Sequence, residues 1–516
     1  MKKGDRNIKI DLKKRRGIKL AIIVVICILI FVLLFILYMK NISNTATGKA
    51  ISDLSDSSAL VTVNFSDEVG RVGDNFYGAN IQRISMEGTN ILKIDTSLDS
   101  LVYNGNTNMS WHKQNWLDSK MNYFRDFVRF DYFYHNSSNG NLNFTGNLTK
   151  LQQEVQWAYE NNNKILINFH NRVPSFLANS SSWCNNDNTT CPPNNYTIWN
   201  NMVLDIINRT TLGGQYIRAI DIEIGNEPYG SGFLANLATD NINKSLEFVK
   251  IYNSTYNEIK AIYPNVTVGG PAGYTMIQSP NLMKTFLSNM TNKMDFCSIH
   301  PYLNNYITGS ISQQIIDLVN NASYYGANCS RIILSEWNLG YSTDAKTIKN
   351  EISKVNEYEA NIGSVYINIM TFNSSYLIQE IFWQWAESYK YTNNAYYPEY
   401  PQRWSMVSEP RLDNVYYPPY NITKNFATYH SAGSMVVKST SSSNNIMVVA
   451  SKKEESQYIT MINKGNDTLV NLNIFESVGV GIRDLETGET YNINNHSVGV
   501  GRLKQYQIRY FVNFNN

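Results

Sequence analysis

The sequence predicts an α/β protein: a (β/α)8 TIM barrel with a C-terminal β-sandwich domain, preceded by a single N-terminal transmembrane helix. Three observations predict this architecture. An unbroken apolar run occupies residues 20–39, short apolar stretches alternate with helical patterns between residues 76 and 387, and short strands separated by turns follow residue 420. A chain of 516 residues is long enough for one large barrel with an added domain.

The N-terminal region has the pattern of a membrane anchor. Residues 1–19 carry nine Lys/Arg and two Asp, and the next segment is LAIIVVICILIFVLLFILYM. Twenty apolar residues in a helix span a bilayer core, and no small-residue cleavage site follows them. We therefore expect an uncleaved anchor at 20–39, with a cleaved signal peptide as the alternative. The basic segment at 1–19 would lie in the cytoplasm and everything after residue 40 outside the cell membrane.

A Ser/Thr/Asn-rich linker is expected at 40–57, a barrel domain at 58–420 and a β-sandwich at 421–516. The strand at 59–65 either begins the barrel domain or joins the sandwich. The eight barrel strands are expected at residues 76–82, 127–131, 164–170, 219–225, 266–270, 295–300, 331–336 and 380–386. Eight strands that alternate with helices favour a closed parallel barrel. An open doubly wound sheet is less well supported, because the sequence lacks a glycine-rich nucleotide-binding turn.

Charge and cysteine content fit an exported protein. The chain has 44 basic and 42 acidic residues, and nine of the basic and two of the acidic residues lie in the first nineteen positions. The remainder is therefore net acidic and lacks the excess of basic residues that is typical of nucleic-acid binding. Cys184 and Cys191 flank a polar loop, and we expect a disulfide between them, whereas Cys297 and Cys329 are either a second bridge or buried thiols. No metal-binding spacing or cofactor motif occurs. Twenty Asn-x-Ser/Thr sites indicate a glycosylated surface, although an Asn-rich composition also generates such sites.

Polar and aromatic residues gather where the expected barrel strands end. The active site of a TIM barrel lies at the C-terminal ends of its strands, so these side chains should share one rim. The residues expected to bind substrate there are Arg129, His170, Asn226, His300, Tyr302 and Trp385.

Two of the eight strands end on a carboxylate, Glu227 in "IEIGNEP" and Glu336 in "IILSEWN". Cleavage of a glycosidic bond uses two such groups, one to protonate the leaving oxygen and one to attack the anomeric carbon. Arg129, His300 and Tyr302 are the expected hydrogen-bond donors around Glu336. Taken singly, Glu227 fits a helix cap, and Glu336 fits an ion-pair partner of Arg129. The two together favour catalysis.

The motifs Asn226-Glu227-Pro228 and the strand-seven Glu336 resemble those of glycoside hydrolase clan A, a group of retaining (β/α)8 enzymes. The stretch "SEWN" at 335–338 most resembles family 39, "FHN" at 169–171 and "HPY" at 300–302 are similar to family 5, and "FYGANI" at 76–81 resembles families 39, 51 and 79. The resemblance implies that Glu227 is the acid/base and Glu336 the nucleophile. It covers roughly residues 60–510.

We therefore expect a membrane-anchored, extracellular, retaining glycosidase that acts on an oligo- or polysaccharide and needs no metal or organic cofactor. A non-catalytic glycan-binding or adhesion protein on the same fold is one alternative, since fold does not imply function. A cell-surface transglycosidase that uses the same two carboxylates is another. The sequence does not identify the sugar.

Overall fold

The computed structural model describes most of the chain beyond residue 57. The described residues are 58–81, 109–136, 142–144, 148–184, 189–229, 233–238, 241–273, 279–302, 309–339, 352–372, 377–382, 406, 416, 418–476 and 479–514. The expected cytoplasmic segment at 1–19, the anchor at 20–39, the linker at 40–57 and Trp385 lie outside them. Within the described part of the chain, no helix is both long and apolar enough to cross a membrane.

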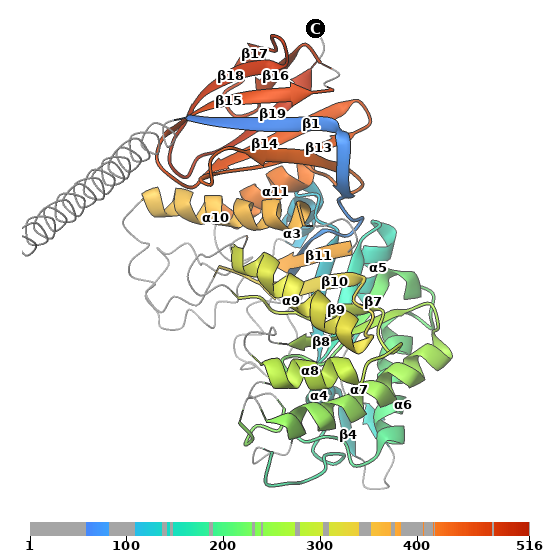
Figure 1. The fold of residues 1–516 in the computed structure, drawn as a ribbon. Coiled ribbons are helices and arrows are strands. Elements are labelled where there is room, and N and C mark those ends of the chain that lie inside the picture. The colour runs from blue at the N-terminus through green and yellow to red at the C-terminus, as the bar shows by residue number, and fades with distance from the viewer. Residues whose placement is uncertain are drawn as a thin grey trace, which may run out of the picture.

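Eight parallel strands close into a barrel, as the sequence predicts (Figure 1). Around the barrel they are hydrogen-bonded in the order β10-β11-β2-β3-β6-β7-β8-β9. Their bounds are β2 Tyr77–Asn80, β3 Tyr123–Val128, β6 Lys164–Phe169, β7 Ile220–Ile224, β8 Thr267–Gly273, β9 Phe296–Ile299, β10 Arg331–Trp337 and β11 Leu377–Phe382. These strands are buried almost throughout, because helices cover the outer face of the barrel while side chains fill its interior.

Helices follow most of the barrel strands. Their bounds are α3 Met109–Asp118, α4 Phe130–Phe133, α5 Thr149–Glu160, α6 Tyr196–Thr210, η1 Ile217–Ala219, α7 Ile242–Ile262, α8 Pro280–Ser288, α9 Gly309–Tyr325, α10 Ile352–Met370 and α11 Pro418–Tyr429. Local chemistry sets several of the starts. The Asn195 side chain caps α6 by accepting a hydrogen bond from the Ile198 amide, and Pro280 occupies the first turn of α8. A short hairpin, β4 Tyr134–Asn136 and β5 Leu142–Phe144, follows α4.

The C-terminal strands form one continuous nine-stranded sheet in the order β17-β16-β19-β14-β13-β12-β1-β15-β18. Their bounds are β1 Ser58–Arg71, β12 Met435–Ser441, β13 Ile446–Lys453, β14 Ser456–Asn463, β15 Thr468–Phe475, β16 Gly481–Asp484, β17 Thr490–Asn492, β18 Ser497–Leu503 and β19 Ile508–Phe514. Inward-facing side chains from all of these strands except β17 form one common buried core. The sheet therefore curves so that its two halves pack face to face, as in a β-sandwich.

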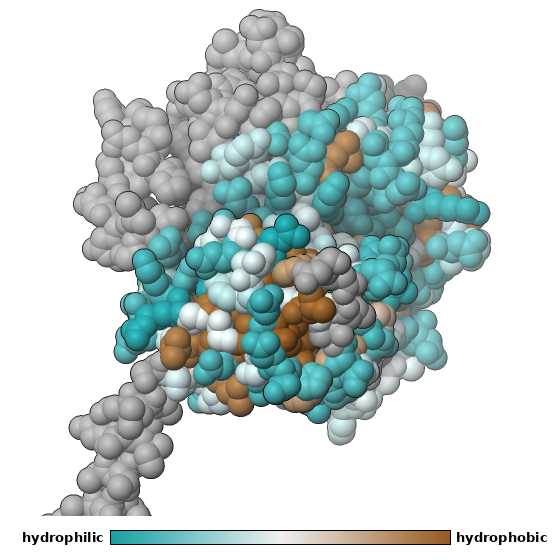
Figure 2. Space-filling view, turned by 90° about the horizontal axis from the view of Figure 1, so that it is seen from above, coloured by the Kyte–Doolittle hydropathy of each residue, from teal (hydrophilic) through white to brown (hydrophobic). Residues whose placement is uncertain are grey.

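The strand expected at 59–65 lies in this C-terminal sheet. As β1, it pairs antiparallel with β12 and parallel with β15, so the sheet combines the first and last described parts of the chain. The sheet packs against the barrel through α10 and α11, whose buried side chains share one core with Val449 and Ile462. Seen from above, the face over the sheet is mostly hydrophilic, with one gathering of hydrophobic side chains (Figure 2).

Two disulfides lie in the barrel domain. Cys184 is joined to Cys191 in the loop after β6, and Cys297 on β9 is joined to Cys329 just before β10. The sequence left the second pair open between a bridge and two thiols, and the structure has the bridge. The first bridge closes part of the long loop on the side of the barrel where the strands end.

Candidate active site

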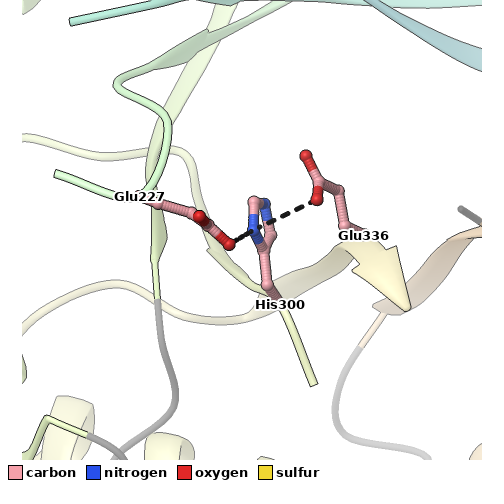
Figure 3. A group of neighbouring side chains, drawn as sticks. All are labelled: Glu227, His300 and Glu336. Atoms are coloured by element: carbon pink, nitrogen blue, oxygen red, sulfur yellow. Dashed lines mark hydrogen bonds and ion pairs between the residues drawn. The ribbon is translucent and has the colours of Figure 1, made fainter. Parts of the chain in front are cut away.

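Three side chains meet at the C-terminal ends of β7, β9 and β10. Glu227 follows β7, His300 follows β9, and Glu336 lies near the end of β10. A carboxylate oxygen from each glutamate and one ring nitrogen of His300 all lie within 4.8 Å of one another. Figure 3 shows the imidazole between the two carboxylates, which approach it from the turn after β7 and from the end of β10. Two residues 109 positions apart in the chain thus form a close pair.

The turn after β7 explains the unusual "GNEP" sequence. Gly225 has φ +92°, and a Cβ there would lie 2.4 Å from the Phe248 ring, so the strand must end on glycine. Glu227 itself has φ +43°, and its amide donates to the Ala272 carbonyl at 2.7 Å. The Asn171 side chain accepts from the Asn226 amide at 3.2 Å and donates to the Asn226 carbonyl at 2.7 Å. Neighbouring strands therefore hold the turn that presents Glu227 to the site.

The two carboxylates have different surroundings. Glu336 is almost buried, with 6% of its side chain exposed; Arg125 Nη1 donates to its Oε1 at 2.6 Å, and the Tyr302 hydroxyl donates to its Oε2 at 2.6 Å. Glu227 is 31% exposed, and its Oε1 lies 3.1 Å from His300 Nδ1. The same nitrogen lies 3.5 Å from Glu336 Oε2. A charged donor thus contacts Glu336, whereas Glu227 faces solvent and one imidazole.

Arg125 organises the floor of the site. Its guanidinium is fully buried and donates to Glu223 Oε2 at 2.6 Å, to Glu336 Oε1 and to Asn226 Oδ1 at 2.9 Å. Burial lowers the pKa of Arg125, but the charges of Glu223 and Glu336 more than offset that effect and raise it. The arginine is therefore a permanent cation in contact with both Glu336 and the residue that precedes Glu227.

The structure corrects the expected position of the arginine. The second barrel strand runs over 123–128 rather than 127–131, so Arg129 lies beyond its end. Its Nη2 pairs with Asp131 Oδ2 at 2.6 Å, and its guanidinium lies 4.0 Å from the centroid of the Tyr132 ring. Arg125 is the donor to Glu336 that was assigned to Arg129. Arg125 interrupts the apolar pattern of its strand, and burial of such a charge requires partners that only the folded barrel supplies.

Among the other expected site residues, Asn226, His300 and Tyr302 lie at the carboxylate pair. His170 follows β6, with its ring 6.3 Å from that of Phe127. Burial, followed by the positive charges of Arg129, Arg172 and Arg125, holds the pKa of His170 well below its usual range, so the ring is neutral. Its role in binding substrate stays a prediction.

Two residues of the site, Glu223 and Arg125, were not among those expected from the sequence. Both interrupt otherwise apolar strands, and both point into the barrel beneath the carboxylate pair. Successive side chains of a strand alternate in direction, so Asp221 and Glu223, two positions apart, point to the same side of the sheet. Two carboxylates on one side of a strand that is otherwise apolar are a signal that could have identified Glu223, because a buried charge is costly unless it has a partner.

The cluster of Glu227, His300 and Glu336 is the only group of three potential metal ligands that meets in the described part of the chain. Both oxygens of Glu336 already accept hydrogen bonds, from Arg125 and from Tyr302. The guanidinium supplies the positive charge that a metal would bring. We therefore assign no metal to this site.

Comparisons with known proteins agree with this geometry. The sequence model of glycosyl hydrolases family 39 matches residues 116–345, a range that contains Glu227, His300 and Glu336. The match confirms the resemblance to family 39 stated from the motifs. No curated protein matches the chain.

Solved structures share the fold at low sequence identity. A family 39 β-xylosidase from Caulobacter crescentus has a TM-score of 0.59 and 14% identity, over 88% of this chain and 99% of that one. A family 39 enzyme from Xanthomonas axonopodis pv. citri has a TM-score of 0.60 and 12% identity, over 89% and 97%. A family 51 α-L-arabinofuranosidase from Bifidobacterium longum has a TM-score of 0.60 and 12% identity, over 89% and 100%. The family match and the shared fold indicate a glycosidase.

Proposed function

We propose that this protein is a retaining glycoside hydrolase in which Glu336 is the nucleophile and Glu227 the general acid/base. The observation that carries the proposal is the pair of carboxylates within 4.8 Å of each other at the C-terminal rim of the barrel. Retaining enzymes keep their two carboxyl groups about 5 Å apart, whereas inverting enzymes separate them by more than about 6.5 Å to admit a water molecule. The spacing here supports direct attack by one carboxylate.

The reaction follows from the two environments. In the first step an oxygen of Glu336 attacks the anomeric carbon, and Glu227 transfers its proton to the glycosidic oxygen as the carbon–oxygen bond breaks. The aglycone leaves as an alcohol, and the sugar stays bound to Glu336 as an ester. In the second step Glu227 takes a proton from water, the hydroxide oxygen attacks the same carbon, and Glu336 leaves as a carboxylate. Two inversions give net retention.

The assignment of roles rests on the hydrogen-bond donors. Arg125 and Tyr302 each donate to Glu336, and donors of this kind favour a negative charge. A nucleophile must carry that charge before it attacks. Glu227 has greater exposure and reaches the imidazole of His300, so it can exchange protons with solvent between the two steps. The Asn226 amide, oriented through its oxygen by Arg125, is the group we assign to a sugar hydroxyl.

Pentosides are the first substrates to test. Structures with the same fold include a β-xylosidase and an α-L-arabinofuranosidase, and these names describe those proteins. Aryl β-xylosides and aryl α-L-arabinofuranosides therefore come first, followed by glucosides, galactosides and glucuronides. We assign the substrate to the oligo- and polysaccharides as a class.

The decisive experiment measures hydrolysis by the full chain and by two matched variants. Glu336→Gln should lose activity on every glycoside, because an amide does not attack the anomeric carbon. Glu227→Gln should lose about 10²–10⁴-fold on substrates with a poor leaving group and far less on dinitrophenyl glycosides, which need little protonation. Surface Glu455→Gln is the control and should match wild type. Proton NMR of the first sugar released should show the substrate's own anomeric configuration.

Other outcomes are equally informative. Release of the opposite anomer would refute double displacement. If wild type and Glu336→Gln are equally inert on all of these glycosides while the protein still binds glycans, the adhesion alternative replaces the enzyme. If wild type forms new glycosides faster than free sugar, the two carboxylates serve transglycosylation instead.

We further propose that the catalytic domain is extracellular, glycosylated and held at the cell membrane by residues 20–39. The apolar run, the basic residues before it and the twenty glycosylation sites support this location. In a eukaryotic host, the full chain should resist alkaline extraction from membranes and lose mass on treatment with an N-glycan-releasing enzyme. Recovery of the unmodified chain in the soluble fraction would contradict both parts of the proposal.

A further inference from the structure

A buried carboxylate lies beneath the catalytic pair and takes no part in the steps above. Glu223 is on β7, four residues before Glu227, and is fully buried. Its Oε2 accepts from Arg125 Nε at 2.6 Å and from Asn168 Nδ2 at 2.8 Å. Burial raises the pKa of Glu223, but the neighbouring Arg125 and His300 more than offset this and lower it. Glu223 is therefore charged in the folded protein.

One guanidinium thus serves two carboxylates. Arg125 contacts Glu223 through Nε and Nη2 and Glu336 through Nη1, each at 2.6 Å. The three groups are almost completely buried and carry a net charge of minus one, so each carboxylate limits how strongly the arginine can stabilise the other. A surface residue would have little such influence, because water and salt would screen it.

We propose that Glu223 is a positioning residue that fixes the Arg125 guanidinium against Glu336 and offsets part of its positive charge. The inference rests on the function proposed above and assigns a role to a residue outside the reacting pair. A nucleophile held too tightly by an unopposed cation would be stable as an anion but weak in attack. With Glu223 in place, Arg125 aligns Glu336 while leaving it reactive.

Four charged or titratable groups face Glu336 and influence its charge. Arg125 reaches it from β3, Tyr302 and His300 from the segment after β9, and Glu227 from the turn after β7. Glu223 acts on it through Arg125. Because Glu223 is the only one of these groups that does not touch Glu336 or the second catalytic carboxylate, its charge can be removed without altering the reacting atoms.

The Glu223→Gln variant removes the charge while keeping the contacts. Both hydrogen bonds to Glu223 reach the same oxygen, Oε2, and an amide oxygen can accept them from Arg125 and Asn168. The amide nitrogen would take the place of Oε1, which has no hydrogen-bond partner in the described part of the chain. The matched control is Asp221→Asn, two residues earlier on β7.

Asp221 is equally buried and ion-paired, but with Arg331 and Lys164. Its neutralisation therefore disturbs the same strand without touching Arg125. Circular dichroism and thermal melting establish first that each variant is folded. If Glu223→Gln does not fold, Glu223→Ser, which also removes the charge, is measured in the same way.

The main readout is the pH profile of kcat/KM for the full chain on the best aryl glycoside. Loss of the Glu223 charge should move the acidic limb, which reports Glu336, to lower pH by about one unit, because an adjacent negative charge is removed. The rate at the plateau should fall, since a more strongly held carboxylate is a weaker nucleophile. Asp221→Asn should leave the acidic limb where it is in wild type. An acidic limb that is unmoved in Glu223→Gln, or moved equally in both variants, would overturn the proposal.

A second measurement separates this inference from the proposed enzyme activity. The Glu336 carboxyl carbon can be followed by ¹³C NMR in protein labelled at glutamate, with Glu336→Gln identifying its resonance. Its titration should shift to lower pH in Glu223→Gln. An inactive wild type would refute the proposed function, while this titration would still support or refute the coupling between the two carboxylates.

Discussion

Replacement of Glu380 by glutamine should change how the stability of the protein depends on pH. Glu380 lies on β11, and its side chain is fully buried on the outer face of the barrel, against α10. Its carboxyl accepts from Trp337 Nε1 at 2.5 Å, from the Gly78 amide at 3.2 Å and from the Tyr366 hydroxyl at 3.3 Å. None of these three donors carries a charge. Burial accordingly raises the pKa of Glu380 from 4.5 to about 8.

The sign and size of the effect follow from this shift. A carboxyl whose pKa is raised on folding contributes stability that is fully present below the unfolded value and is lost as the pH rises through the folded value. Each pH unit is worth about 1.4 kcal/mol, so the group should remove about 4 kcal/mol of stability between pH 5 and pH 8. Glu380→Gln has no proton to lose and should lack this slope.

Urea unfolding of the full chain, followed by tryptophan fluorescence at pH 5, 6, 7 and 8, measures the difference. The stability of the variant relative to wild type should rise across this range by about 4 kcal/mol. Exposed Glu455→Gln serves as the control, because its carboxyl is hydrated in both states. Parallel curves for wild type and Glu380→Gln would contradict the raised pKa, since they would mean that Glu380 ionises in the folded protein as it does in water.

Three further predictions concern the site and the barrel. Tyr302→Phe removes the 2.6 Å hydrogen bond to Glu336 and should lower kcat/KM about 10- to 100-fold in steady-state assays, with an unchanged value arguing against that contact. Arg125→Ala leaves two buried carboxylates without their cation and should lower the free energy of unfolding by about 3–5 kcal/mol in urea, whereas Arg129→Ala should lower it by about 1 kcal/mol or less. Equal losses would contradict the assignment of Arg125, rather than Arg129, as the buried cation of the site. Gly78→Ala would place a Cβ 2.1 Å from a backbone carbonyl oxygen of β3, so soluble yield and melting temperature should fall sharply, and a normal melt would show that the strands can separate there.

The hydrophobic pattern was enough to predict the barrel. Parallel barrel strands are buried on both faces, so they appear in the sequence as short apolar runs between amphipathic helices. All eight expected strands overlap observed ones. The pattern failed where charged residues are buried. In β3, Arg125 and Asp126 interrupt the apolar run, and the strand was therefore placed too late in the sequence.

The carboxylate pair was also predictable, but its surroundings were not. Glu227 and Glu336 each follow a strongly apolar strand, and the barrel topology requires such strand ends to share a rim. By contrast, the choice between Arg125 and Arg129 depends on which guanidinium points inward from β3, and one residue of register reverses that direction. The partners that make burial of Arg125 favourable come from β7 and β10, about 100 and 210 residues further along the chain.

The barrel class and the two carboxylates are predictable from the sequence, because they depend on local periodicity and on residues at strand ends. The pairing of β1 with β12 and β15, and the contacts of Arg125 with both Glu336 and Glu223, are evident only in the folded protein. A buried charge is stable only beside a partner of opposite charge, and the partners of Arg125 lie on other strands. The "GNEP" turn combines both kinds of information: its glycine and glutamate are evident in the sequence, but the neighbours that position Glu227 arise from folding.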